Sequence, residues 1–242
     1  SHRSLKPDAE LLDLCLSKLT GSAASLLTNN GAAAVLLSTS TLCQGKKLVV
    51  ASSHLIRLED FDYCSLIQSS GAKIKEIGCS NRVHLRDYER ALDEDEDTAA
   101  ILYVHRPNFE TLGFTKEVPV IELSALAKSR GKQLIVVEGL GSLLDLRLFG
   151  HRRNPLVKDY VEAGADVVCF SCNKLIGGPP GGVILSSQKL RDRMKANYLY
   201  RSLRLDWLRQ WELEEVLKLF FDLDRLPERH PLYELLDRKS VV

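Results

Sequence analysis

The sequence predicts an α/β fold of three layers, in which helices flank a mainly parallel, buried sheet. From residue 46 onward, short apolar runs rich in valine and isoleucine alternate with segments of helical pattern. These runs are bounded by helix- and strand-breaking residues, which indicates buried strands. The 242 residues, 45% of them hydrophobic, are enough for one large domain with a sizeable core.

The N-terminal half begins with an expected helix that Asp8 can cap, that has a leucine-rich face and that Gly21 ends. Residues 28–35 (TNNGAAAV) follow, and their small side chains open a second helix whose first amides are accessible to an anion. Taken alone, Asn29 and Asn30 are better explained as turn and N-cap residues. Further strands are then expected at residues 47–51, 72–77 and 99–104, and helices at 58–71, 85–92 and 119–130.

The C-terminal half continues the alternation. Strands are expected at residues 133–137, 167–170 and 183–185, and helices at 154–163, 187–196 and 213–223. Residues 224–242 are charged, interrupted by proline and without a strand pattern. We therefore expect a large domain over residues 1–223, followed at 224–242 by a charged tail or the start of a small domain.

Lys174 stands between two predicted strands and is followed at residues 177–182 by Gly-Gly-Pro-Pro-Gly-Gly. This run cannot be regular helix or strand, so the lysine lies at a strand end beside a tight turn. Burying its charge is costly, and attachment to an aldehyde as a Schiff base removes that cost. A surface loop lysine is the alternative. Because ligands bind at the carboxyl ends of parallel strands, Lys174, Glu138 and residues 105–108 (HRPN) are expected to share one rim.

Composition bears on whether the chain binds nucleic acid, a membrane or a metal ion. The net charge of +1 gives no global attraction to nucleic acid, so any basic surface is local. Since no apolar run is long enough for a membrane span and no signal peptide opens the chain, we expect no membrane partner and a cytoplasmic location. The six scattered cysteines suit a reducing compartment. We interpret Cys169 and Cys172 as small buried hydrophobic residues and expect no metal site.

Several blocks of the chain, taken in order, resemble the bacterial L-seryl-tRNA(Sec) selenium transferases, the selenocysteine synthases that use pyridoxal phosphate (PLP). They include residues 29–35 (NNGAAAV), 78–85 (GCSNRVHL), 104–109 (VHRPNF), 173–179 (NKLIGGP) and 201–206 (RSLRLD). Each block alone is weak, but their shared order from about residue 20 to residue 223 is specific. The resemblance implies a fold-type-I PLP domain like that of aspartate aminotransferase.

The resemblance also implies a site. Lys174 matches the lysine that carries PLP, and residues 29–32 match the helix start that binds its phosphate. The implied cofactor site comprises Asn29, Asn30, Gly31, Ala32, Glu138, Ser171 and Lys174. Arg201 and Arg204 match the pair that holds the anionic selenium donor, although two arginines three apart on a helix can equally face solvent. The implied substrate site comprises Arg201, Arg204, His105 and Arg106.

Glu138 is the expected second catalytic residue beside Lys174. The family has an aspartate that pairs with the pyridine nitrogen of PLP, within a run for which this chain reads Glu-Gly-Leu-Gly-Ser at residues 138–142. A carboxylate at that place keeps the ring nitrogen protonated and the ring electron-withdrawing. We therefore expect Glu138 to face the ring nitrogen.

The resemblance implies that the chain replaces the hydroxyl of seryl-tRNA(Sec) with selenium from selenophosphate. Two alternatives stay open: a PLP-dependent lyase acting on a small amino acid or amino sugar, and a non-catalytic paralogue used for assembly or tRNA binding. Because only the family's large domain is matched, the chain is expected to be a fragment or a shortened relative. We also expect a homo-oligomer, as is usual for the class, with Leu205, Trp207, Leu208 and Trp211 as exposed apolar residues.

Overall fold

The computed structural model describes residues 9–58, 60–152 and 154–237; the predicted cap Asp8 lies outside them. Its main sheet has seven strands: β1 (Ala24–Thr28), β2 (Lys47–Ala51), β5 (Lys73–Ile77), β6 (Thr98–Val104), β7 (Gln133–Gly139), β8 (Val167–Ser171) and β9 (Gly182–Ser186). They lie in the order β1-β9-β8-β7-β6-β2-β5. Strands β5, β2, β6, β7 and β8 pair in parallel, whereas β9 is antiparallel to both of its neighbours. The predicted α/β fold with a mainly parallel sheet is confirmed.

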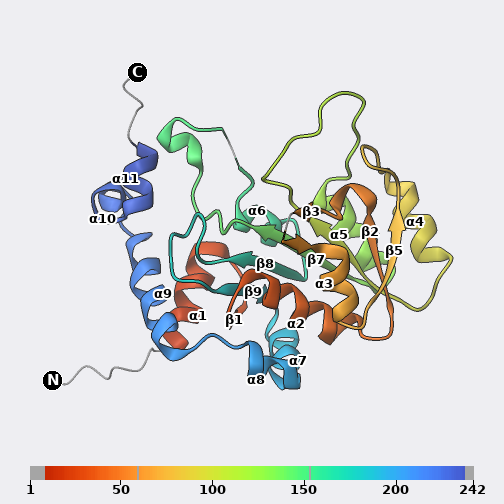
Figure 1. The fold of residues 1–242 in the computed structure, drawn as a ribbon, viewed down its shortest axis with the longest axis horizontal. Helices are drawn as coiled ribbons and strands as arrows, with labels where there is room; N and C mark the ends of the chain where they lie inside the picture. The colour runs from red at the N-terminus through yellow and green to blue at the C-terminus, as the bar shows by residue number, and fades with distance from the viewer. Residues whose placement is uncertain (1–8, 59, 153, 238–242) are drawn as a thin grey trace.

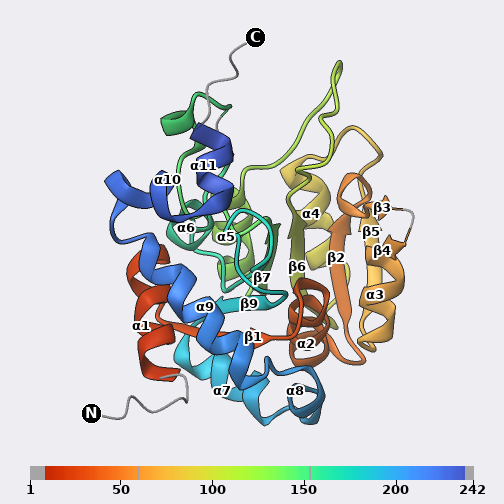
Figure 2. The same cartoon turned by 60° about the vertical axis from the view of Figure 1, so that its left-hand side comes forward.

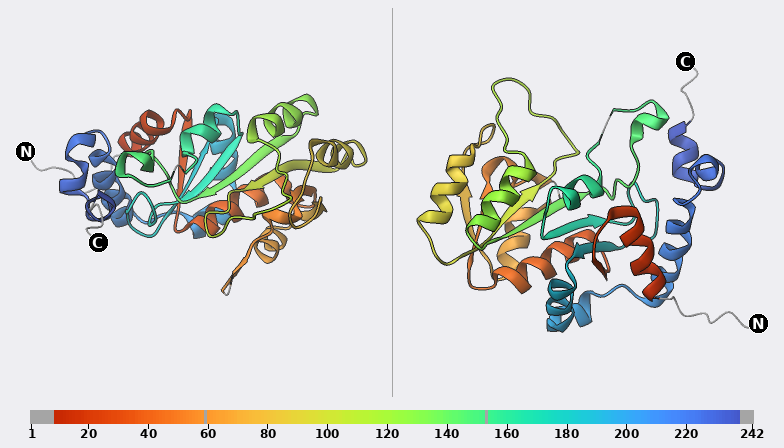
Figure 3. Two further views of the ribbon diagram at one scale, coloured as in Figure 1. Left: turned by 90° about the horizontal axis from the view of Figure 1, so that it is seen from above. Right: turned by 180° about the vertical axis from the view of Figure 1, so that it is seen from behind.

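Helices cover both faces of this sheet, as Figures 1 and 3 show. One face carries α1 (Ala9–Thr20), α4 (Leu85–Asp93), α5 (Val120–Ser129) and α6 (Val157–Glu162). The opposite face carries α2 (Gly31–Cys43), α3 (Tyr63–Ser69), α7 (Gln188–Ala196) and α8 (Tyr198–Leu203). Short 3₁₀ turns occupy Ser52–His54 (η1) and Leu146–Phe149 (η2). Each face has its own apolar cluster, so the sheet residues alternate between two cores.

The segment expected as one helix over residues 58–71 does not form a single helix. It begins as a hairpin of β3 (Arg57–Leu58) and β4 (Phe61–Asp62), and only Tyr63–Ser69 is helical. The Asp62 carboxylate starts this helix by accepting hydrogen bonds from the backbone N of Cys64 (3.0 Å) and Ser65 (3.2 Å). The hairpin projects from the body of the molecule in the left view of Figure 3.

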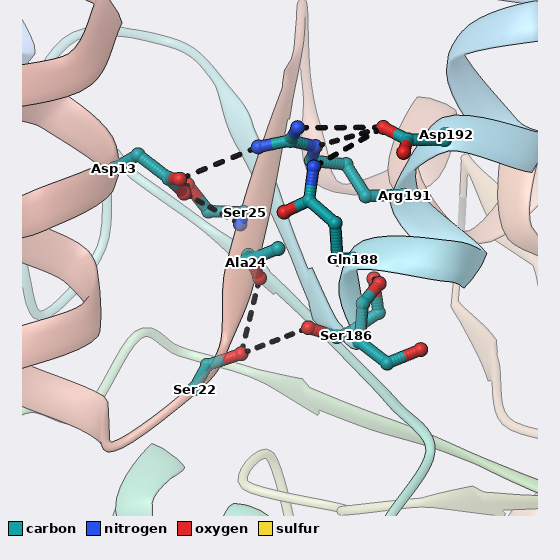
Figure 4. A network of polar contacts seen from close by, with 9 residues as sticks. Asp13, Ser22, Ala24, Ser25, Ser186, Gln188, Arg191 and Asp192 are labelled. Carbon is teal, nitrogen blue, oxygen red and sulfur yellow. Dashed lines mark hydrogen bonds and ion pairs between the residues drawn. The ribbon is translucent and has the colours of Figure 1, made fainter.

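Strand β1 closes one edge of the sheet and is fixed by a polar network that Figure 4 shows. Asp13 of α1 accepts hydrogen bonds from the backbone N (2.7 Å) and Oγ (2.6 Å) of Ser25 in β1. Asp13 also pairs with Arg191 of α7 at 3.4 Å. Ser22 Oγ donates to the carbonyls of Ala24 and Ser186, on β1 and β9. Helices from opposite faces are thus linked across the edge strand.

The C-terminal part continues as α9 (Trp207–Leu219), η3 (Leu223–Arg225), α10 (Leu226–Arg229) and α11 (Pro231–Asp237). Figure 2 shows α9 beside α1, leading to α10 and α11. Helix α9 begins six residues earlier than expected, because Asp206 caps it by accepting from two backbone amides. His230, between α10 and α11, and Tyr233 of α11 contact the backbone of the loop after β8. The domain boundary at residue 223 stays a prediction.

Within the described ranges, no helix has the length and apolar character needed to cross a membrane.

Candidate active site

A cavity of about 310 Å³, called here the first cavity, opens at the carboxyl ends of β6, β7 and β8 and beside the start of α2. Its lining includes six of the predicted site residues: Asn30, Gly31, Ala32, His105, Ser171 and Lys174. The rim that the strand pattern predicts therefore exists, and it joins the helix start to the lysine.

The start of α2 packs directly against the end of β8. Asn30 is extended and caps the helix, its Oδ1 accepting from Ala33 N at 2.8 Å. A Cβ added to Gly31 would collide with Ser171 Oγ, so a larger residue there would push that hydroxyl aside. Asn29 does not line the cavity; its backbone N donates to Leu203 O at 2.7 Å.

Lys174 lies in the loop that follows β8, and its side chain is exposed rather than buried. The desolvation cost expected from the sequence therefore does not apply. The loop backbone is held nonetheless: Gly177 N donates to Lys174 O at 2.9 Å, and Leu175 N donates to Leu140 O at 2.9 Å. The lysine is thus an accessible amine on a fixed backbone.

His105 stands between the first cavity and a neighbouring one of about 720 Å³, the second cavity. Its backbone N donates to Val137 O at 2.9 Å, which holds it against β7. Its Nε2 is buried and has no hydrogen-bond partner among the residues described. Burial lowers the pKa of this imidazole, so the ring is neutral near pH 7 and can donate or accept one hydrogen bond.

Arg106 lines the second cavity, not the first. Its guanidinium donates to Ser53 O (3.3 Å) and pairs with Glu117 Oε2 (3.2 Å). His54 Nε2 lies 2.6 Å from the other oxygen of Glu117. Burial opposes ionisation of Glu117, but His54 and Arg106 outweigh it and lower the pKa of the carboxyl. Neither His54 nor Glu117 was among the site residues expected from the sequence. The two residues are 63 positions apart in the chain, so their contact could not be predicted from local sequence.

Glu138 is fully buried in β7 but does not line the first cavity, whereas its neighbours Val137 and Gly139 do. Its carboxylate accepts hydrogen bonds from the backbone N of Gly141 (2.6 Å) and Ser142 (3.3 Å). Burial raises the pKa of this carboxyl to about 7 against the opposing effect of these bonds. The carboxylate thus holds the turn after β7, and the charge of Lys174 also acts to lower its pKa, so the ring-nitrogen contact stays a prediction.

Arg201 and Arg204 are both exposed and line neither the first nor the second cavity. Helix α8 ends at Leu203, and Arg204 is extended and bridges to Thr28, so the two arginines do not share one helical face as expected. Leu205, expected to be exposed, is buried.

Four lining residues of the first cavity come from the hairpin segment that the sequence did not reveal: Ile56, Leu58, Phe61 and Tyr63. Burial raises the pKa of Tyr63 to about 12, so its hydroxyl stays protonated. The only sequence signal is the spacing of two between Phe61 and Tyr63, which is typical of a strand.

Cys169 and Cys172 are buried, as predicted, and burial raises the pKa of each thiol to about 12. Among the described residues no three His, Cys, Asp or Glu side chains gather in a way that could hold a metal ion.

Comparison with known proteins places this geometry in context. A family model described as L-seryl-tRNA selenium transferase matches residues 3–242. Relatives with the name L-seryl-tRNA(Sec) selenium transferase include those of Nitratidesulfovibrio vulgaris, 41% identical over 222 residues, and of Methylocella silvestris, 41% identical over 224. These matches cover 91% and 92% of this chain but 47% of each relative. The chain thus spans about half the length of the curated relatives it matches.

Solved structures support the fold. D-glucosaminate-6-phosphate ammonia-lyase superposes with a TM-score of 0.74 at 19% identity, covering 88% of this chain and 57% of the lyase chain. An aspartate aminotransferase double mutant of Thermus thermophilus superposes with a TM-score of 0.63 at 16% identity, covering 91% and 59%. At such low identity the likeness establishes the aminotransferase-like fold alone.

Proposed function

Because the chain belongs to the L-seryl-tRNA selenium transferase family, we propose that it binds PLP in the first cavity and acts on seryl-tRNA(Sec). In this reaction the seryl hydroxyl leaves as water, and selenium from selenophosphate takes its place; the P–Se bond is hydrolysed and inorganic phosphate leaves. The observation that supports the proposal most strongly is that one cavity joins the start of α2 to Lys174 at the carboxyl edge of the sheet.

The lining residues fit the two ends of PLP. A phosphate is favoured at the start of α2, where the first amides have no partner within the helix and the helix dipole is positive. Gly31 keeps that surface open to close approach, and Lys174 offers its amine in the same cavity. When bound, PLP supplies an aldehyde that condenses with a lysine amine, releasing water, and a ring that accepts electrons.

His105 and Arg106 are proposed to serve the substrates. The neutral His105 has an unpartnered Nε2 between the two cavities, so it can hydrogen-bond a group that reaches from one to the other. The second cavity is lined by three cationic side chains, Arg106, Lys116 and Arg152. Glu110 and Glu117 line it too and pair with Arg152 (4.0 Å) and Arg106 (3.2 Å), so a phosphate-like anion would compete with these carboxylates for the guanidinium groups.

Arg201 and Arg204 keep their proposed role as donor-binding arginines only if the site is completed from outside this chain. They line neither cavity here. A homo-oligomer, in which a neighbouring copy supplies them, is therefore part of the proposal. Asn29 likewise stays a predicted cofactor contact, although it does not line the first cavity.

Reduction with borohydride in the presence of PLP, followed by peptide mapping, tests the cofactor assignment. We expect a pyridoxyl label on Lys174 and its loss in Lys174→Ala. The matched control is Lys189→Ala, which removes another exposed lysine remote from the cavity lining and should leave labelling unchanged. Labelling at another lysine, or none at saturating PLP, would overturn the assignment.

One observation favours a second candidate, a chain that binds PLP without transferring selenium: the carboxylate expected at the ring nitrogen does not line the cavity. An assay with charged tRNA(Sec) and selenophosphate separates the two functions, since only the first produces selenocysteinyl-tRNA. The lyase alternative is supported by no observation beyond the shared fold.

A further inference from the structure

The second cavity adjoins the first and is more than twice as large, about 720 Å³ against about 310 Å³. His105 and Pro107 line both cavities, so a ligand can extend from one into the other past these two residues. Most of the second lining comes from the loop between β6 and α5, which projects from the molecule in Figure 1. The second cavity therefore suits a part of the substrate that continues beyond the group held near Lys174.

Neutral hydrogen-bonding side chains are the most numerous kind in the lining of the second cavity. Besides His105, they are those of Ser53, Asn81, Tyr103, Thr111, Thr115 and Asn154. Two prolines and Phe109, which is 50% exposed, add flat apolar surface. Arg106 is already paired with Glu117, and Arg152 is paired with a second glutamate of the lining. A ligand with hydroxyl groups and a flat ring matches this lining better than a small free anion does.

Both oxygens of the Glu117 carboxylate are held in place. The fully buried His54 has its Nε2 2.6 Å from Oε1, and a guanidinium nitrogen of Arg106 lies 3.2 Å from Oε2. The side chain is nevertheless 37% exposed and lines the second cavity. Because the pKa of this carboxyl is lowered, the group is an acceptor only, and each oxygen keeps a lone pair for one more donor. A hydroxyl group that enters the cavity can donate to it.

The proposed substrate has such a hydroxyl beside its reacting group. In an aminoacyl-tRNA, the amino acid is esterified to one ribose hydroxyl of the terminal adenosine, and the neighbouring ribose hydroxyl is free. If the seryl group lies near Lys174, the ester and the ribose continue into adjoining space. His105, whose buried Nε2 has no hydrogen-bond partner among the residues described, stands between the two cavities and can bond the ester.

We propose that the second cavity holds the terminal nucleoside of the aminoacyl-tRNA, with Glu117 accepting its free ribose hydroxyl and Phe109 stacking on its base. This inference rests on the proposed action on seryl-tRNA(Sec). A carboxylate that accepts a ribose hydroxyl and an aromatic ring that stacks on a base both recur in nucleotide recognition. His54 and Arg106 are then positioning residues, because they act on the nucleoside through Glu117. The free hydroxyl also distinguishes an RNA end from a DNA end.

The experiment uses the full chain loaded with PLP and two stable amide analogues of the substrate end. One is 3′-deoxy-3′-(L-serylamino)adenosine, and the other is the same compound without its 2′-hydroxyl. Calorimetric titration gives their dissociation constants. We expect the wild type to bind the compound with the hydroxyl roughly tenfold more tightly, because a hydrogen bond to a charged group contributes that much. Dissociation constants that agree within about threefold, or no binding of either compound, would overturn the inference.

Glu117→Gln should reduce this preference to about threefold or less, because a neutral amide is a weaker acceptor than a carboxylate. Glu110→Gln is the matched control: it removes the other carboxylate of the same lining and should keep the tenfold preference. Pyridoxyl labelling of Lys174 shows whether the first cavity is intact in each variant. An equal loss of preference in both variants would overturn the role of Glu117.

Phe109→Ala provides a second variant for the case in which Glu117→Gln does not fold. It removes the half-exposed ring and should weaken both analogues roughly tenfold while the preference between them stays. Unchanged affinities in this variant would overturn stacking on the base.

Failure of the inference differs from failure of the proposed function. A wild type that makes selenocysteinyl-tRNA without distinguishing the two analogues overturns the inference alone. A wild type whose Lys174 takes no pyridoxyl label, and which makes no selenocysteinyl-tRNA, overturns the proposed function as well.

Discussion

The buried carboxyl of Glu138 makes the stability of the protein depend on pH. Burial raises its pKa from the ordinary 4.5 to about 7, so between these pH values the folded state holds a proton that the unfolded state releases. Its stabilising effect is complete below about pH 4.5 and is lost as the pH rises towards 7, with a total on the order of 3 kcal/mol.

Glu138→Gln should therefore gain stability relative to the wild type between pH 5 and pH 8. Denaturant unfolding of both proteins without cofactor, at several pH values across this range, measures the difference. Glu76→Gln, which removes an exposed carboxylate, controls for the loss of one negative charge. A constant difference between Glu138→Gln and wild type across the range would contradict the raised pKa.

Part of the candidate site could be predicted from the sequence, but the position of the Glu138 carboxylate could not. Lys174 and residues 30–32 were correctly brought together, because a glycine-rich turn after a strand and a small-residue helix start both lie at the carboxyl edge of a parallel sheet. Glu138 lies at the same strand end, but the backbone amides of Gly141 and Ser142 hold its carboxylate, and its place at the ring nitrogen stays a prediction. Such contacts depend on how the turn after β7 folds, which the sequence of β7 does not contain.

At the scale of elements, the lysine loop is fastened from two sides. Leu140, on the turn after β7, holds its backbone from one direction. From the other, Tyr233 of α11 donates its hydroxyl to Leu175 O (2.9 Å), and His230 Nε2 donates to Ile176 O (2.8 Å). The segment after residue 223 therefore contributes to the geometry of the candidate site.

Tyr233→Phe should lower the free energy of unfolding by about 1 kcal/mol, because it removes one hydrogen bond while keeping the ring. It should also slow pyridoxyl labelling of Lys174, since the loop is held by one bond fewer. Tyr198→Phe is the matched control: Tyr198 is 94% exposed, and surface changes of this kind stay within about 0.5 kcal/mol. Equal stability and equal labelling in Tyr233→Phe and wild type would show that α11 does not support the loop.

Two elements escaped sequence prediction for local reasons. Strands β3 (Arg57–Leu58) and β4 (Phe61–Asp62) have two residues each, too few for a periodic pattern to show. Strand β1 was not recognised because Ala24 and Ser25 weaken its apolar run. Its extended form is stabilised by pairing with β9 and by the Asp13 and Arg191 contacts, which come from distant parts of the chain.

For the whole molecule, alternation of strands and helices was enough to predict the layers but not the strand order. Strand β9 inserts antiparallel between β1 and β8, so the first and last strands of the sheet in sequence become neighbours. That arrangement depends on the tight turn at residues 177–182, which reverses the chain beside β8. Turn composition indicates a reversal, but it does not specify which edge of the sheet the next strand will join.

The surface of α9 supports the last prediction, self-association of the chain. Leu213 and Leu217 pack inward, whereas Trp207 and Trp211, four residues apart, are 58% and 44% exposed on the outer side. Large aromatic residues gathered on one surface are typical of interfaces rather than of a monomer. The double substitution Trp207→Glu and Trp211→Glu should therefore lower the particle mass measured by light scattering at tens of micromolar.

The matched control for this double variant replaces Leu112 and Phe114 with glutamate, which adds the same charge at two apolar side chains that are 81% and 86% exposed on another loop. We expect that control to keep the wild-type mass. If α9 forms the interface, dissociation by the α9 variant should also weaken anion binding that depends on Arg201 and Arg204, because these arginines line neither the first nor the second cavity. A monomeric wild type, or a double variant that stays associated, would remove α9 as the interface and leave the two arginines to solvent.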